Sequence, residues 1–167
     1  HIGEERFATS GAELIALSGQ LAQKVKDSTS QNIKVAAGIP PVFGSYSPDD
    51  FVTADAVTML EVFKQNLLPF TDIVLAETQS SIDEVTTIQK VFADCGQPLW
   101  ISMTLEDDAE ASDSRLRSGE LLSDALSAIN LDQIDAILFN CSQPEVMAKA
   151  VTLSAKRLPS DIDIGVY

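Results

Sequence analysis

Five short apolar runs, separated by stretches of helical pattern, constrain the fold of this chain more than any other feature. The runs are rich in β-branched side chains and do not alternate with polar positions, as expected for parallel strands covered on both faces. They lie at residues 35–39, 72–77, 98–103, 135–140 and 163–167. The amphipathic stretches between them predict right-handed helical crossovers, and therefore an α/β fold with a parallel sheet.

Apolar stripes and capping sequences predict the helices between these runs. The two clearest stripes, which we expect to face the core, are Phe7, Leu14, Leu17, Leu21, Val25 and then Val57, Leu60, Phe63, Leu67, Leu68. Thr53 is expected to cap the second of these helices. Residues 81–84 and 142–145 both fit a capping box, in which a serine and a glutamate satisfy free amides. Gly96 suits the left-handed position after a helix end.

Two architectures accommodate these β/α units in one domain. A flavodoxin-like sandwich of five strands would be complete at 167 residues, whereas a (β/α)8 barrel needs about 250. The chain begins on a helix with His1 instead of methionine, and it stops inside its last apolar run. Both ends therefore look cut, which argues against the flavodoxin-like alternative. The polar stretch 104–120 is too long for an ordinary turn, and we expect a lid or a mobile loop there.

The charge balance and the cysteine count disfavour several classes of function. With 25 acidic and 11 basic residues, the net charge of -14 disfavours nucleic acid and anionic membranes as partners. No apolar run approaches the roughly 20 residues of a membrane span. Two cysteines are too few for a disulfide scaffold, so we expect a cytoplasmic protein. The sequence leaves the oligomeric state open.

Candidate chemistry lies at the carboxyl ends of the runs, where α/β folds collect functional groups. Glu77 ends the second run, and Asn140 and Cys141 end the fourth. A carboxylate beside an apolar run is either functional or part of a structural network. Cys141 is either a small buried side chain or, at a helix start, a thiol favoured in its thiolate form. Cys95 fits burial.

Several kinds of catalytic site lack their parts in this chain. No glycine-rich phosphate loop of the dinucleotide-binding or P-loop type occurs. The only histidine is His1, so a Cys-His or Ser-His couple is implausible. Two distant cysteines without a usable histidine do not supply the three protein ligands of a catalytic zinc. The acidic pair at 107–108 fits a solvated loop better than a metal site.

Four segments, taken in order, carry a resemblance to a known family. The most specific are LAET at residues 75–78 and FNCS followed by PE within residues 139–145. Residues 35–50 and 98–108, VAAGIPPVFGSYSPDD and PLWISMTLEDD, add to them. Together they resemble the homocysteine S-methyltransferases, which are zinc-dependent (β/α)8 barrels. The resemblance implies that residues 1–167 form a single partial homocysteine-binding barrel domain, truncated at both ends and lacking the first two strands and the last.

The resemblance also implies roles for particular residues. Cys141 matches the first of three zinc-binding cysteines, of which the other two lie further along a complete chain. Glu77 matches the glutamate that holds the substrate amino group, and Asn140 matches the asparagine before the zinc cysteine, so both are expected to bind substrate. Tyr46 and Ser102 lie in matching pocket-facing segments, without an assigned role.

The implied activity is that of a methyltransferase in methionine biosynthesis. Zinc would activate the thiol of homocysteine, which takes a methyl group from a small donor, and a sulfonium donor is favoured. Residues 1–167 alone are expected to be inactive and to bind zinc weakly. The alternatives are a non-enzymatic α/β binding or interaction domain, in which Glu77 and Cys141 are structural, and a flavin-binding sandwich, for which no phosphate-binding loop is present.

Overall fold

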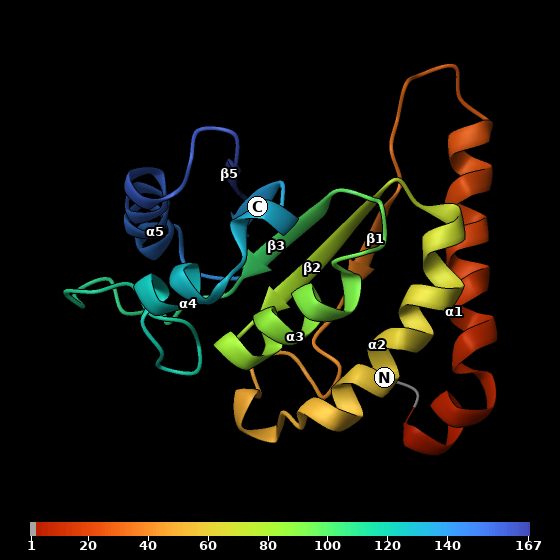
Figure 1. Cartoon of the computed structure of the whole chain (residues 1–167), viewed down its shortest axis with the longest axis horizontal. Helices are drawn as coiled ribbons and strands as arrows, with labels where there is room; N and C mark the ends of the chain where they lie inside the picture. Colours follow the sequence, from red (N-terminus) through yellow and green to blue (C-terminus); the bar gives the residue numbers. More distant parts are fainter. Residues whose placement is uncertain (1–2) are drawn as a thin grey trace.

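The computed structural model describes residues 3–167 and consists of a five-stranded parallel sheet flanked by helices (Figure 1). The strands are β1 (Ala36–Ile39), β2 (Ile73–Gln79), β3 (Leu99–Met103), β4 (Ala136–Phe139) and β5 (Asp163–Val166). The helices are α1 (Glu4–Asp27), α2 (Thr53–Leu67), α3 (Ile82–Phe92), α4 (Leu122–Ala128) and α5 (Pro144–Arg157), with short 3-10 helices η1 (Pro48–Asp50), η2 (Leu68–Phe70) and η3 (Leu131–Gln133). All five predicted strands are present. His1 lies outside the described residues.

The order of the strands decides between the two predicted architectures. Every pairing is parallel, and the order β1-β2-β3-β4-β5 follows the chain. A flavodoxin-like sheet reverses its order once, which places helices on both faces. Crossovers of one hand between neighbouring strands place every helix on the same face instead. The flavodoxin-like alternative is therefore wrong, and the chain forms consecutive β/α units as in part of a (β/α)8 barrel.

A contact across the sheet shows that it is curved like the wall of a barrel. The Tyr167 hydroxyl, just after β5, donates to Glu77 Oε1 on β2 at 3.2 Å. Two strands lie between them, so a flat sheet would separate their backbones by about 14 Å, with the side chains standing perpendicular to it. The side of the sheet that carries Glu77 and Tyr167 is therefore concave, and the helices cover its convex side (Figure 1).

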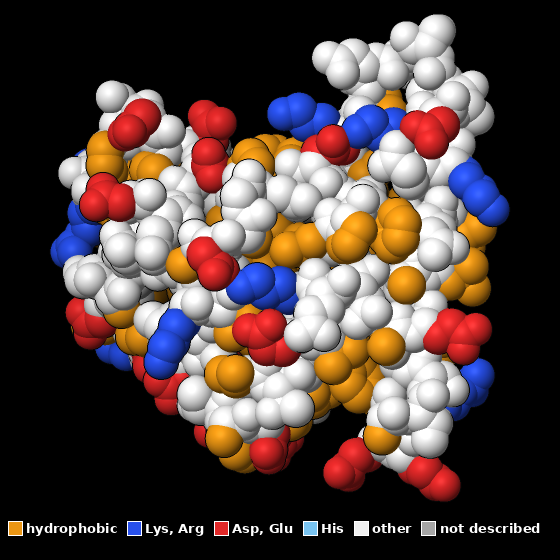
Figure 2. All heavy atoms as spheres, turned by 45° about the vertical axis from the view of Figure 1, so that its right-hand side comes forward, with side chains coloured by type: hydrophobic (Ala, Val, Ile, Leu, Met, Phe, Trp, Pro, Cys, Tyr) orange, Lys and Arg blue, Asp and Glu red, His pale blue; other side chains and the backbone are white. Residues whose placement is uncertain are grey.

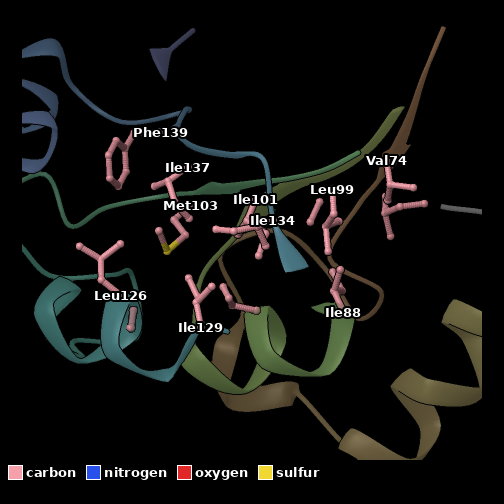
Figure 3. Close-up of a cluster of buried hydrophobic side chains, with 14 of the residues drawn as sticks. Val74, Ile88, Leu99, Ile101, Met103, Leu126, Ile129, Ile134, Ile137 and Phe139 are labelled. Atoms are coloured by element: carbon pink, nitrogen blue, oxygen red, sulfur yellow. The ribbon is translucent and has the colours of Figure 1, made fainter. Parts of the chain in front are cut away.

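The main core lies between the convex side of the sheet and the helices (Figure 3). Alternate strand residues point there and are fully buried, such as Ile101 and Met103 on β3. On the concave side, Leu75 and Trp100 pair across β2 and β3 but are only partly buried. Within the described residues, the expectation of strands covered on both faces is therefore met on the convex face only.

The helix α1 packs through glycines instead of the leucines of its predicted stripe. Gly11 and Gly19 are its buried residues, and a Cβ at Gly19 would lie 2.8 Å from Phe70 in η2. Only glycine allows so close an approach. Four members of the predicted stripe are exposed, which corrects the expectation that they face the core; they are Leu14, Leu17, Leu21 and Val25. Figure 2, which brings this side forward, shows hydrophobic side chains at the surface among charged ones.

The helix-start signals have mixed outcomes. Ser81 caps α3 in a capping box with Glu84, as predicted. The prediction for Thr53 is wrong, because α2 begins at Thr53 itself and Val52 occupies the cap position without a capping side chain. Gly96 adopts the expected left-handed conformation, with φ 73°.

Among residues 3–167 we find no helix with the length and hydropathy needed to span a membrane.

The stretch 104–120 is irregular, as predicted, but buried residues anchor it. Leu105 and Leu116 are fully buried and pair in an antiparallel bridge. The Ser142 hydroxyl oxygen accepts a hydrogen bond of 2.8 Å from the Leu105 amide. This bond holds the start of the stretch against the turn after β4. Ser142 therefore does not cap a helix as predicted, and α5 begins two residues later at Pro144.

Replacing Gly19 with leucine should push α1 away from η2. Overpacking of this kind costs about 1–3 kcal/mol of unfolding free energy, which urea denaturation measures. Leu17→Ala, on the exposed side of the same helix, is a matched control with an expected change within about 0.5 kcal/mol. A Gly19→Leu variant as stable as the parent would show that α1 does not need this close approach.

Glu84 should make the stability depend on pH in a direction opposite to that of most carboxylates. The side chain is 3% exposed, and burial raises its pKa although the amides of Ser80 and Ser81 donate to it. A raised folded pKa contributes stability below the unfolded pKa that is lost as pH rises through the folded pKa. Glu84→Gln cannot ionise, so wild type should lose stability relative to this variant from acid to neutral pH in thermal unfolding. A difference that does not change with pH would contradict this.

Candidate active site

The carboxyl ends of β2, β3 and β4 carry a hydrogen-bond network that ends at the sulfur of Cys141. Asn140, just after β4, is 2% exposed and lies at its centre. Asn140 Nδ2 donates to Thr78 Oγ1 at 2.7 Å and to Cys141 Sγ at 3.2 Å. Asn140 Oδ1 accepts from Ser102 Oγ at 2.8 Å. Both polar atoms of the amide have partners, so three strands together determine how Asn140 faces the sulfur.

Three residues around this network adopt the left-handed backbone conformation that non-glycine residues normally avoid. They are Tyr46 with φ 65°, Thr78 with φ 60° and Cys141 with φ 53°. Each such residue costs of order 1–2 kcal/mol, and residues of this kind cluster at functional sites. At Thr78 the pairing of β2 with β3 also shifts its register, as β-strands often do beside active sites.

Cys141 is exposed at the rim of the sheet. The interpretation of this residue as a small buried side chain is therefore wrong. Its sulfur accepts from the Asn140 amide, and the Thr78 hydroxyl lies 3.9 Å away. Cys95 differs from Cys141 in position and in exposure. It precedes β3, at the amino ends of the strands, and packs against the core as expected. Its thiol donates to the Gln97 carbonyl at 3.6 Å.

Tyr46 brings a phenol to the same sulfur from the loop after β1. Interaction with Cys141 and, after it, burial raise the pKa of Tyr46 above its ordinary value. A phenol with a raised pKa keeps its proton at neutral pH, so the side chain beside the sulfur is neutral. The Arg117 guanidinium lies over the Tyr46 ring, 5.3 Å from its centroid. The sequence assigned no role to these two residues, although an aromatic residue in the loop after a strand was a signal for Tyr46.

Glu77 lies at the carboxyl end of β2 on the concave side of the sheet, where Tyr167 reaches it. Burial raises the pKa of Tyr167 to about 12, and the charge of Glu77 contributes to the shift. Beside them, a Cβ at Gly38 would lie 3.5 Å from Glu77 Oε2, so the glycine leaves space next to the carboxylate. None of the three ion pairs between residues 3 and 167 involves Glu77. Among the described residues, its carboxylate therefore has no cationic partner.

The described residues do not by themselves fit a catalytic zinc site. Such a site needs three protein ligands. Between residues 3 and 167, no group of three His, Cys, Asp or Glu side chains is placed to hold a metal ion. Cys141 offers one sulfur at the carboxyl ends of the strands, whereas Cys95 lies at their amino ends. Asp107, from the acidic pair at 107–108, is engaged by Arg117 at 2.7 Å.

Comparisons with known proteins identify the family and the fold. A family model described as homocysteine S-methyltransferase matches residues 1–167. No curated protein matches the sequence. Among solved structures, the apo form of the homocysteine methyltransferase MmuM from Escherichia coli is similar, with a TM-score of 0.73 and 18% sequence identity. The match covers 95% of this chain and 68% of that chain, and at this identity it concerns the fold.

Proposed function

Because this chain belongs to the homocysteine S-methyltransferase family, we propose that it contributes to an enzyme that methylates the thiol of homocysteine to give methionine. The observation that carries the proposal is the convergence on Cys141. An exposed thiol in a strained conformation accepts a hydrogen bond from the Asn140 amide, and the phenol of Tyr46 interacts with the same residue. Strained residues of this kind cluster at active sites, ligand clamps and switch regions, which argues against the purely structural Cys141 of the non-enzymatic alternative.

Glu77 would hold the amino group of homocysteine. Its carboxylate faces the concave side of the sheet, has space beside Gly38 and forms none of the ion pairs within residues 3–167. A charge-assisted hydrogen bond to a substrate ammonium suits such a group. The Tyr167 hydroxyl holds the other carboxylate oxygen in place. Glu77 would thereby fix the amino acid end of the substrate while its thiol points toward the rim.

Asn140 would serve the substrate through Cys141. Its amide is buried and bonded to Thr78, Ser102 and the Cys141 sulfur, so its contribution is to keep that sulfur in position. The reaction itself forms a bond between the homocysteine sulfur and the methyl carbon as the donor bond breaks, with loss of the thiol proton. Alignment of the two substrates is the largest contribution such a site makes.

Cys141 would be the one zinc ligand that residues 1–167 provide, because a cysteine thiolate is a preferred zinc donor. We place the other two ligands outside these residues, within the same barrel domain. The enzyme would act in methionine biosynthesis in the cytoplasm, with homocysteine and a small methyl donor, preferably a sulfonium, as substrates. Residues 1–167 would then be inactive on their own.

Substitutions at Cys141 and Glu77 in the full-length protein test the proposal. With homocysteine and a panel of methyl donors, Cys141→Ser should abolish methionine formation. Glu77→Gln should raise the KM for homocysteine about 10- to 100-fold, because a charged hydrogen bond contributes roughly 1.5–3 kcal/mol. Cys95→Ser is the matched control and should keep full activity. A fully active Cys141→Ser variant would overturn the proposed role of this residue.

Zinc analysis of the isolated 167-residue chain tests the incomplete site. We expect far less than one zinc per chain after dialysis, and no methionine formation with any donor. Elemental analysis and the activity assay provide the two measurements. A zinc content near one per chain would show that these residues hold the metal by an arrangement other than the one proposed.

A further inference from the structure

Arg117, in the stretch between β3 and α4, touches three different loops of the rim. Its Nη2 donates to Asp107 Oδ2 at 2.7 Å and to the Cys141 carbonyl oxygen at 3.2 Å. Its Nε donates to Thr104 Oγ1 at 3.4 Å, and its guanidinium covers the Tyr46 ring. One planar group therefore connects the loops that follow β1, β3 and β4.

The hydrogen bond from Arg117 to the Cys141 carbonyl oxygen helps to fix the direction in which the Cys141 sulfur points. Cys141 has a φ of 53°, a conformation that a non-glycine residue keeps only when its surroundings hold it. Its carbonyl oxygen accepts from Arg117 and from Thr104 Oγ1, the latter at 3.3 Å. These two donors fix the peptide plane after Cys141. Without the guanidinium, a single neutral donor remains and the residue can relax toward an ordinary conformation.

The contact with Tyr46 holds a second side chain that interacts with Cys141. Tyr46 is 49% exposed and also left-handed, so its own loop provides little support. A guanidinium over the ring face attracts it electrostatically and by stacking. Arg117 therefore holds the ring of Tyr46 and the peptide of Cys141 with one rigid group.

Asp107 fixes the guanidinium in turn. Its Oδ2 pairs with Arg117, and its Oδ1 accepts the amide of Gln143 at 2.7 Å at the start of α5. The Gln143 amide, with the Arg117 guanidinium, holds the pKa of Asp107 below its usual range. The carboxylate is thus charged at neutral pH, and it ties Arg117 to the turn that carries Cys141.

We propose that Arg117 is a positioning residue of the methyl-transfer site, which sets the phenol of Tyr46 and the sulfur of Cys141 in a fixed relation. This inference rests on the proposed function. It differs from a structural role because the contacts of Arg117 converge on the two residues at the sulfur. Its effect should therefore appear in catalysis by folded protein.

Lys149 on α5 offers a matched control within the same stretch. Its ammonium donates to the carbonyl oxygens of Ala109 and Ala111, so it also holds the loop between β3 and α4. It makes no hydrogen bond with Tyr46 or Cys141 among the described contacts. Lys149→Met loosens the loop at a distance from the sulfur, whereas Arg117→Met removes the group that reaches it.

Kinetics of the full-length protein test the proposal. Arg117→Met should lower kcat/KM for methyl transfer about 100-fold, since a misplacement near 1 Å has an effect of that size. Arg117→Lys should recover at most about a tenth of the lost activity, because lysine keeps the charge but lacks the planar fork. Lys149→Met should stay within about twofold of wild type. An Arg117→Met variant with wild-type kcat and KM would overturn the proposal.

Alkylation by iodoacetamide gives a second readout that does not depend on methyl transfer. Mass spectrometry measures the rates at Cys141 and Cys95 in one sample, with Cys95 as the internal reference. Arg117→Met should change their ratio at least threefold, and Lys149→Met should leave it unchanged. If wild type transfers no methyl group but the ratio shifts, the proposed function fails while the positioning role stands. An unchanged ratio in Arg117→Met would overturn that role.

Discussion

Parallel pairing in chain order, along a curved sheet, is the constraint on which the rest of this structure depends. Each crossover joins neighbouring strands with the same hand, so the helices collect on the convex side. The carboxyl ends of the strands then form one rim, and the loops that follow them become neighbours. Curvature brings the ends of β2 and β5 together, where Tyr167 meets Glu77. Residues distant in the chain share a site for this reason alone.

The strain at the rim requires support from around it. Three left-handed residues, Tyr46, Thr78 and Cys141, together cost several kcal/mol by ordinary magnitudes, of order 1–2 kcal/mol for each. The buried Asn140 amide and the Arg117 guanidinium supply hydrogen bonds that only this geometry allows. A conformation held from several loops is well suited to keep a reactive sulfur in one place.

Sequence patterns correctly predicted those features whose hydrogen bonds and hydrophobic contacts lie between residues close together in the chain. The five strands and the Ser81 capping box formed as expected, because their hydrogen bonds lie within a short segment or follow from local hydrophobicity. The prediction for Ser142 failed because the Leu105 amide, from another loop, takes its hydroxyl. The stripe of α1 failed because the approach of Phe70 requires Gly19, so the glycine side faces inward and leucines such as Leu17 face outward.

The sequence by itself determined that β/α units alternate, that Glu77 and Cys141 stand where strands end, and which family the motifs resemble. These follow from residue order, hydrophobicity and motif spacing. Only the tertiary structure decided the strand order, the curvature and the meeting of Tyr46 and Arg117 with Cys141. Those features rest on contacts between distant residues, such as Tyr167 and Glu77, which are 90 positions apart. No local pattern encodes such a contact, because it exists only once the sheet has closed partway on itself.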